Sequence, residues 1–395
     1  MRDVSIVGIG RTPVGEHWDT SLRELAVEAA QEAMVDAGLE RDRIDALYVG
    51  NALGGAVSGQ QHLGPLLADF IGLRGVESYT VEAADASGGV ALRTGWLAVA
   101  SGAADVVMVL GVEKMTDEVG PARVAAHTSL LDADYEAVQG ATPVALAALL
   151  MRMYMDTYNV ALEQFEGFSI NAHANGSRNP YAMFRNQIKP GRFATAPVVA
   201  PPVNLFDGAP DADGAAALIL APTEWALDMA PRPVRIVAST VATDTLALHD
   251  RPDPLFLTAA NLSAGRAYRQ AGIGPDDVDL FELHDSFTVL SALTLEACGF
   301  AGRGEGWRLA AQGRIGPDGS IPISTFGGLK ARGNPLGATG VYQAVEGALQ
   351  LRGEAGDNQI PGARRALVQN LGGLGATAVT HVLEQIAQDE RDFPA

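Results

Sequence analysis

The sequence predicts an α/β protein built from two similar halves, and two observations carry this prediction. Alanine-rich segments with helical periodicity, such as residues 22–38, alternate with short β-branched runs such as "VSIVGI" and "DVVMVLG". This alternation is typical of parallel sheets covered by helices. The chain also contains an internal repeat, in which residues 36–51 ("DAGLERDRIDALYVGN") match residues 270–285 ("QAGIGPDDVDLFELHD").

Each copy of the repeat is predicted to end a helix on glycine, turn, and enter a strand. A second correspondence links residues 86–111 to residues 338–356, each a helix followed by a short hydrophobic strand. The predicted domains are therefore residues 1–230 and residues 231–395, which meet at "APRPV". Residues from about 115 to 205 differ in sequence pattern from the two halves around them and include a proline-rich stretch. They predict an insertion in the first half, where substrate-contacting loops often accumulate.

Composition excludes several classes of function. The 28 basic and 47 acidic residues give a formal net charge of −19, which argues against nucleic acid as a partner but allows a small phosphorylated ligand. The single cysteine, Cys298, excludes an intramolecular disulfide and a multi-cysteine zinc site, and no metal is expected. There is no charged-then-apolar leader and no apolar run of about 18 residues. We expect a soluble, cytoplasmic protein with no membrane partner.

Several motifs together resemble the thiolase superfamily, in its archaeal and sterol-carrier-protein-type group. They are "GVEKM", "ELHDSFT", "FGGLKARGNPLGATGVYQ" and "QNLGGLGAT", and the similarity covers essentially the whole chain. The resemblance implies a thiolase fold, with two βαβαβ-type halves forming a five-layered αβαβα core, and a homodimer or homotetramer. It also implies a role in lipid metabolism, a coenzyme A thioester as substrate with no covalently bound cofactor, and allows a small zinc-containing OB-fold partner protein.

The sequence departs from the thiolase pattern at the residues that form the acyl-enzyme. Thiolases need a cysteine thiolate as nucleophile and a histidine in a "GHP" segment that activates it. The nucleophile position falls on Asp85, in "VEAADASGG", and the "GHP" position reads Gly333-Asn334-Pro335. The second family cysteine is also missing from the C-terminal glycine-rich loop that contains Gly373. Cys298 lies in an amphipathic helix that ends on glycine, so we expect it to be buried away from the chemistry.

Other candidate residues come from two further motifs. His284, in "HDSF", follows a hydrophobic strand-like run and matches the family position that orients a water or substrate oxygen; alternatively, a backbone group satisfies it. Backbone N–H groups of the glycine-rich loop could face an oxyanion or a phosphate. Lys330 and Arg332 could approach coenzyme A phosphates or lie on a solvated face. The predicted catalytic residues are Asp85, His284, Asn334 and Gly373, and the predicted coenzyme A-binding residues are Ser87, Gly88, Ser286, Lys330 and Gly333.

Asp85 has four interpretations from sequence. It could cap the following helix, as an aspartate at a strand-to-helix junction often does. It could act as a general base toward a coenzyme A thioester. It could attack the thioester to give a mixed anhydride, or it could be a laboratory substitution, which the additional loss of the histidine disfavours.

These interpretations lead to three hypotheses of function. The first is an enzyme that makes or breaks carbon–carbon bonds in acyl-CoA thioesters without a cysteine acyl-enzyme, by retro-aldol, retro-Claisen or decarboxylation chemistry. The second is a catalytically silent thiolase-like subunit that binds coenzyme A ligands or supports a partner. The third is a conventional acetyl-CoA or acyl-CoA C-acyltransferase with a relocated nucleophile.

Overall fold

The computed structural model describes residues 1–386, and nine of the strands within them form one continuous mixed sheet. The order across this sheet is β3-β2-β4-β7-β1-β8-β11-β10-β9. Its strands are β1 (Val4–Arg11), β2 (Ala46–Gly50), β3 (Glu77–Val81), β4 (Val107–Glu113), β7 (Gly214–Pro222), β8 (Val234–Thr243), β9 (Leu280–Glu282), β10 (Arg365–Gly372) and β11 (Thr377–Gln385). A separate short pair consists of β5 (Val198–Ala200) and β6 (Val203–Asn204).

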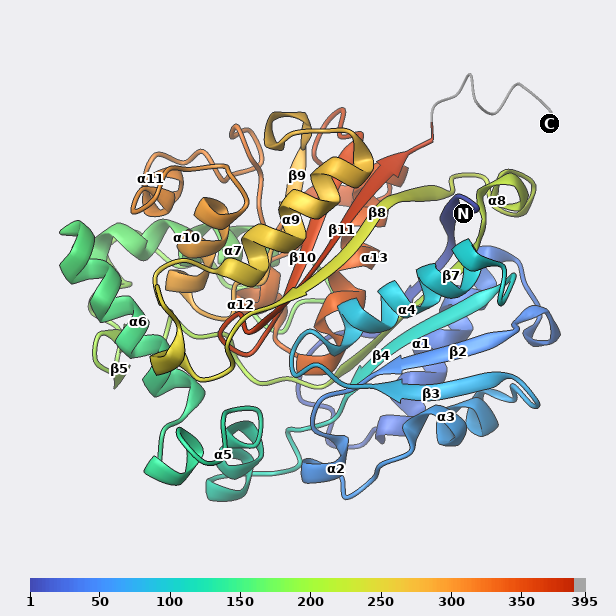
Figure 1. Cartoon of the computed structure of the whole chain (residues 1–395), viewed down its shortest axis with the longest axis horizontal. Helices are drawn as coiled ribbons and strands as arrows, with labels where there is room; N and C mark the ends of the chain where they lie inside the picture. The colour runs from blue at the N-terminus through green and yellow to red at the C-terminus, as the bar shows by residue number, and fades with distance from the viewer. Residues whose placement is uncertain (387–395) are drawn as a thin grey trace.

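The helices alternate with these strands as the sequence predicts (Figure 1). They are α1 (Leu22–Ala37), α2 (Gly54–Val57), α3 (Leu63–Ile71), α4 (Ser87–Ser101), α5 (Pro121–Thr128), α6 (Pro143–Tyr158), α7 (Glu166–Gly176), α8 (Thr223–Met229), α9 (Thr258–Ala271), α10 (Thr288–Ala297), α11 (Gly306–Ala311), α12 (Gly328–Arg332) and α13 (Thr339–Arg352). Within the described part of the chain, none of them is both long and apolar enough to cross a membrane.

The internal repeat is confirmed. Helix α1 ends before Gly38, which adopts a left-handed conformation with φ of 63°, and the chain then enters β2. Helix α9 ends in the same way before Gly272, with φ of 71°, and the chain enters β9. Glycine reaches this conformation without the steric cost that a Cβ would add. The repeat therefore has a physical basis in two equivalent helix ends.

The prediction of parallel sheets is wrong, because the sheet contains both parallel and antiparallel strand pairs. Strand β2 pairs parallel with β4, and β9 pairs parallel with β10, but β7 and β11 run antiparallel to their neighbours. Strands β10 and β11 are joined by residues 373–376 alone. So short a connection can join only antiparallel strands, since a parallel pair needs a crossover of a dozen or more residues.

The hydrophobic side chains divide into three main clusters, which pack the layers of helices and strands against one another. One lies between α1, α3 and the strands of the first half, and one surrounds α4 and α13 between the two halves. The third lies between the strands of the second half and α9 with α10. Figure 1 shows α9 on one side of the molecule and α1 with α3 on the opposite side. Strand β4 illustrates the division, because Val107 and Val109 face the central cluster while Met108 and Leu110 face the outer one.

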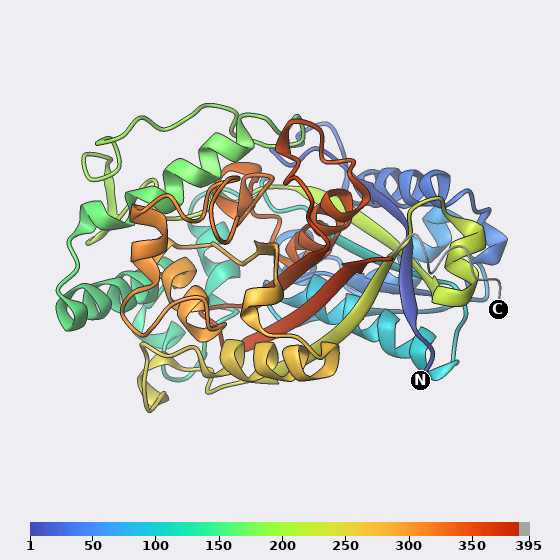
Figure 2. The ribbon, with the colours of Figure 1, turned by 90° about the horizontal axis from the view of Figure 1, so that it is seen from above.

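The inserted region extends from the end of β4 and carries α5, α6 and α7. Figure 2 shows α6 and α7, in green, at the end of the molecule that is remote from the N-terminus. Helices α6 and α7 pack on the second half, where Leu150, Tyr154 and Phe168 join its outer hydrophobic cluster. The insertion is therefore anchored to the half that does not contain it in sequence.

Candidate active site

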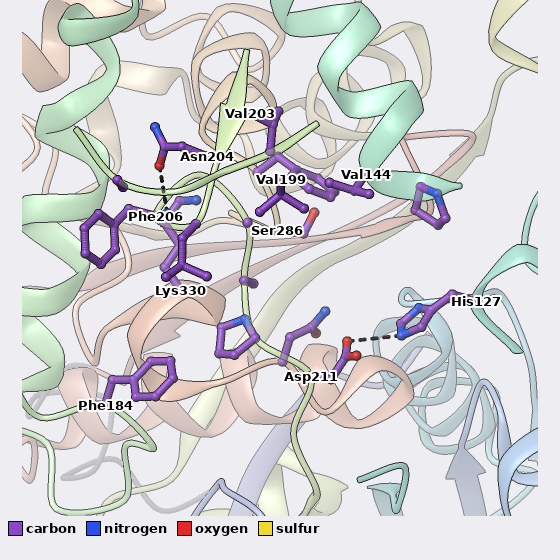
Figure 3. Close-up of a pocket in the computed structure, with 18 of the residues that line it drawn as sticks. His127, Val144, Phe184, Val199, Val203, Asn204, Phe206, Asp211, Ser286 and Lys330 are labelled. Atoms are coloured by element: carbon purple, nitrogen blue, oxygen red, sulfur yellow. Dashed lines mark hydrogen bonds and ion pairs between the residues drawn. The ribbon is translucent and has the colours of Figure 1, made fainter. Parts of the chain in front are cut away.

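A pocket of about 950 Å³ opens where the two halves and the inserted region meet, and the inserted region supplies most of its wall. Many of the lining side chains are apolar, among them Val144, Phe184, Val199, Val203 and Phe206 (Figure 3). Polar side chains, among them Asp85, Lys330 and Asn334, lie between these apolar ones, and such a mixed lining suits a small-molecule site.

The turn between β3 and α4 presents Asp85 to this pocket. Ala84 adopts a left-handed conformation with φ of 52°, which costs an L-residue about 1–2 kcal/mol. The Ser87 hydroxyl holds this conformation, because it donates to the Ala84 carbonyl at 2.6 Å and accepts from the Ala83 N–H at 2.9 Å. The strained turn thus fixes the direction in which the side chain at position 85 leaves the backbone.

The Asp85 carboxylate bonds to the other half of the protein and does not cap its own helix. Its Oδ2 atom accepts a hydrogen bond from the Gly373 N–H at 3.2 Å, and no side chain caps α4, whose N-cap residue is Ala86. The capping interpretation of Asp85 is therefore wrong. Gly373 also lines the pocket, but its N–H is engaged by Asp85 and is not a free oxyanion donor.

Asn334 lines the same pocket from the glycine-rich loop. Its Oδ1 atom accepts from the Thr339 hydroxyl at 2.9 Å, so its Nδ2 group is the side that can donate to a ligand. An amide cannot take up a proton at neutral pH, so Asn334 cannot replace a histidine as a base. It can still stabilise negative charge that develops on a substrate oxygen.

His284 lies behind the pocket wall and does not line it. The Asn370 side chain accepts from the Gly89 N–H with its oxygen, so its Nδ2 donates to His284 Nδ1 at 3.2 Å and the imidazole proton is assigned to Nε2. Burial lowers the pKa of His284 to about 4, although the charge of Asp85 opposes this. The ring is therefore neutral at pH 7. Among the described residues its Nε2 atom has no hydrogen-bond partner.

The predicted coenzyme A-binding residues separate into two groups. Ser286 and Lys330 line the pocket, whereas Ser87, Gly88 and Gly333 do not. A Cβ atom at Gly88 would lie 2.7 Å from the Gly337 carbonyl oxygen, and one at Gly333 would lie 2.6 Å from Val14. These two glycines allow close packing beneath the pocket.

Lys330 and Arg332 are both buried, so the interpretation of a solvated charged face is wrong. The Lys330 ammonium donates to the Asp207 carbonyl, and burial lowers its pKa to about 8 although Asp285 and Asp207 oppose this. Arg332 pairs with Glu346 at 2.7 Å. Lys330 still lines the pocket, whereas Arg332 does not.

Sequence reasoning missed a histidine–aspartate pair that lines the pocket. The His127 Nε2 atom lies 3.1 Å from Asp211 Oδ1 (Figure 3). Lys189 and Arg192 also line the pocket and are exposed. No motif marks these residues, and the only signal was their position in or next to the insertion predicted to contact substrate.

Cys298 is buried at the end of α10, remote from the pocket lining, as expected. Its Sγ atom lies 3.4 Å from Gln369 Oε1, and burial raises the pKa of the thiol to about 12. Because only the thiolate reacts rapidly, we expect iodoacetamide to leave the native protein unlabelled while it labels the urea-unfolded chain fully. Intact-mass measurement distinguishes the two. Rapid native labelling that parallels loss of activity would instead support a relocated nucleophile.

Comparison with known proteins gives the family. Residues 4–197 match the thiolase N-terminal domain, and residues 240–385 match the thiolase C-terminal domain-like family. The chain belongs to the thiolase family. This confirms the resemblance and the fold class inferred from the sequence motifs.

Relatives of this thiolase-family protein have different names. It is 44% identical over 385 residues to an acetyl-CoA acetyltransferase of Methanothermobacter thermautotrophicus, covering 98% of this chain and 100% of the relative. It is 31% identical to sterol carrier protein 2 of Bos taurus, covering 95% of this chain and 71% of that protein. It is 30% identical to benzoylsuccinyl-CoA thiolase subunit BbsB of Thauera aromatica, covering 95% and 96%.

A solved structure titled Ltp2-ChsH2(DUF35) aldolase shares the fold with this thiolase-family protein. The TM-score is 0.84 with 24% sequence identity, and the match covers 98% of both chains. At this identity the likeness concerns the fold alone.

Proposed function

We propose that this thiolase-family protein breaks or forms a carbon–carbon bond in an acyl-CoA thioester without a cysteine acyl-enzyme. The observation that carries the proposal is the Asp85 carboxylate, which lines the pocket at the position that the sequence motif assigns to the thiolase nucleophile. A carboxylate at this point can accept a proton, but it is a far weaker acyl carrier than a thiolate.

Retro-aldol cleavage of a β-hydroxyacyl-CoA needs only the groups found here. Asp85 takes the proton of the β-hydroxyl group, and the O–H electron pair becomes the new carbonyl π bond. The Cα–Cβ bond breaks, and its electrons pass to Cα and the thioester oxygen as an enolate. The Asn334 Nδ2 group donates a hydrogen bond to that oxygen. Protonation of Cα then gives a shorter acyl-CoA and an aldehyde or ketone, and the reverse sequence forms the bond.

The two alternative reactions have requirements that match the groups of the pocket less closely. Retro-Claisen cleavage requires an activated thiol or water nucleophile, whereas decarboxylation of a malonyl-type thioester requires no base. The retro-aldol reaction uses the Asp85 carboxylate directly as its base and needs no additional nucleophile, and we therefore favour it.

Two cations support coenzyme A as the carrier of the substrate. Lys189 and Arg192 are exposed and line the pocket of a chain with a formal net charge of −19. Basic side chains retained at a pocket rim in so acidic a protein suit the phosphates of coenzyme A.

We also propose that the protein works in an assembly. One relative is named as a subunit, and the solved structure with the same fold is titled Ltp2-ChsH2(DUF35) aldolase. From the family resemblance we propose a small zinc-containing OB-fold partner and a homodimer or homotetramer. Strand β3 supports a homodimer, because it is an edge of the sheet and pairs with β2 alone among the described strands.

The purified protein should bind coenzyme A or an acyl-CoA but should not thiolyse acetoacetyl-CoA at a thiolase-like rate. The reason is the absence of a thiol at position 85 and of a base at position 334. Thermal melting with and without coenzyme A checks binding, and loss of acetoacetyl-CoA absorbance checks thiolysis. Ordinary thiolase turnover in a preparation free of host enzyme would contradict the proposal.

A screen of coenzyme A thioesters with mass-spectrometric detection tests the reaction itself. It compares β-hydroxyacyl, β-ketoacyl and malonyl thioesters, with and without the OB-fold partner. Asp85→Asn is the matched control, because asparagine keeps an oxygen for the Gly373 N–H but cannot accept the proton. We expect cleavage of a β-hydroxyacyl-CoA and a loss of about 10²-fold or more in Asp85→Asn. Equal activity of the variant would show that Asp85 is not the base, and no cleavage at all would favour a silent subunit.

A further inference from the structure

His127 is held at the pocket wall by an ion-pair cluster that no thiolase motif includes. Its Nε2 atom lies 3.1 Å from Asp211 Oδ1, and the other oxygen of Asp211 lies 3.3 Å from Arg123 Nε. The side chains of His127 and Asp211 are 19% and 28% exposed, so the pair is partly shielded yet reachable from the pocket. With Nε2 facing Asp211, Nδ1 is the nitrogen that can exchange a proton with a ligand.

The cluster is tied to the proposed oxyanion donor through the backbone. The segment that carries Asp211 runs parallel to Asn334, whose N–H donates to the Pro210 carbonyl at 3.0 Å. The Asn334 carbonyl in turn accepts from the Ala212 N–H at 3.3 Å. His127, Asn334 and Asp85 all line one pocket, and each comes from a different segment of the chain.

The geometry points to His127 as the second acid–base residue of this site, oriented by Asp211 and acting together with Asp85. This inference rests on the proposed carbon–carbon chemistry and assigns the protonation of Cα, for which that chemistry names no donor. After Asp85 has taken the hydroxyl proton and the Cα–Cβ bond has broken, the His127 imidazolium donates its Nδ1 proton to Cα. The enolate electron pair forms the new C–H bond. The imidazole is left neutral, Asp85 is left protonated, and proton exchange with water restores both.

The charges around His127 favour its protonated form. Burial works against the imidazolium, but the Asp211 carboxylate 3.1 Å away, with a smaller contribution from Asp85, raises the pKa of His127 above its usual value. Arg123 is the one cation that opposes this among the groups acting on the ring. An imidazole acid with a raised pKa and a carboxylate base that line the same pocket are the arrangement that paired proton transfer needs.

A simpler interpretation is that the ion pair of His127 with Asp211 is only a structural contact, which holds α5 against the rest of the protein. The test therefore needs a measured quantity that a purely structural role of His127 would not change. In heavy water, an α-methyl-β-hydroxyacyl-CoA gives propionyl-CoA with one deuterium at Cα. This carbon then carries H, D and a methyl group, so an enzymatic donor that acts from one face gives a single configuration. A structural contact has no influence on which face receives the deuterium.

The experiment measures cleavage of an α-methyl-β-hydroxyacyl-CoA in heavy water by wild-type protein, His127→Gln and Asp211→Asn. His249→Gln is the matched control, because His249 also lies beside an aspartate, at 3.4 Å from Asp250, but does not line the pocket. We expect kcat to fall about 10²- to 10⁴-fold in His127→Gln with little change in KM, and deuterium to appear on both faces of Cα. Asp211→Asn should lose less activity, and its rate should fall at a lower pH than that of wild-type protein. His249→Gln should resemble wild-type protein.

The outcomes separate the two proposals. If wild-type protein cleaves the thioester and a folded His127→Gln variant keeps the rate and the one-sided deuterium label, the role of His127 is wrong while the reaction stands. If His127→Gln is slow but keeps one-sided labelling and the wild-type pH profile, His127 only fastens α5. If wild-type protein cleaves no β-hydroxyacyl-CoA, both proposals fail. Melting temperature and the shift caused by coenzyme A confirm that each variant is folded.

Discussion

A chain that carries both Asp85→Cys and Asn334→His should accumulate an acetyl adduct from acetyl-CoA. The strained Ala84 turn would aim the new thiol into the pocket as it now aims the carboxylate. A thiol alone would stay mostly protonated at pH 7, because its unperturbed pKa is about 8.5. A histidine at position 334 supplies the missing base, and we expect about 10²-fold more adduct than in either single variant, because nucleophile and base act as one unit.

Intact-mass spectrometry after timed incubation measures this adduct. The background should also carry Cys298→Ala, so that any adduct can be assigned to position 85. The two single variants and wild-type protein are the controls. If the double variant folds and binds coenzyme A but never acylates, Asp85 does not occupy the nucleophile position of the family.

Removing one partner of the buried Arg332–Glu346 pair should cost more stability than any surface change. The two side chains are 1% and 0% exposed and lie 2.7 Å apart, and the guanidinium also lies over the Tyr342 ring at 5.0 Å. Arg332→Met leaves the Glu346 carboxylate buried without its cation, and we expect the free energy of unfolding to fall by about 3–5 kcal/mol.

The pH dependence of this loss has a definite sign. Burial raises the pKa of Glu346, and Arg332 opposes this, so the variant carboxyl should have a higher pKa than in wild-type protein. A carboxyl whose folded pKa exceeds its unfolded pKa binds protons more tightly in the folded state. The destabilisation should therefore grow as pH rises above the unfolded pKa of about 4.3 and shrink toward acidic pH.

Urea unfolding at several pH values tests both statements. Arg332→Met with Glu346→Leu in one chain should recover part of the lost stability, since no unpaired charge remains. Arg308→Met is the matched control, because Arg308 and Glu305 lie 3.7 Å apart with both side chains 55% exposed. It should change stability by about 0.5 kcal/mol or less. An equal loss in both arginine variants would show that burial of the pair is not the cause.

Local features of the chain could be predicted because the causes are local. Gly38 and Gly272 mark helix ends in the sequence and adopt left-handed conformations in the structure. Cys298 was predicted to be buried from its helix alone, and it is. The strained turn around Asp85 could be recognised from its motif, but its hydrogen bond to Gly373 could not, because the two residues belong to different halves of the chain.

The features that were missed depend on tertiary contacts. A lysine and an arginine in a glycine-rich loop suggest a solvated face, since such side chains are rarely buried unless paired. Lys330 and Arg332 are buried because partners remote in sequence or on a later helix meet them there. His127 and Asp211 likewise lie far apart in the sequence, and only the fold brings their side chains together.

The buried position of Cys298 gives the protein a surface without reactive sulfur across residues 1–386. A cysteine introduced at the pocket rim would then be the one site that a fluorophore labels under native conditions. Val199 suits this purpose, because it lines the pocket and is 56% exposed. The emission of such a probe would report the arrival of each candidate thioester in real time, before any chemistry occurs and without knowledge of the product.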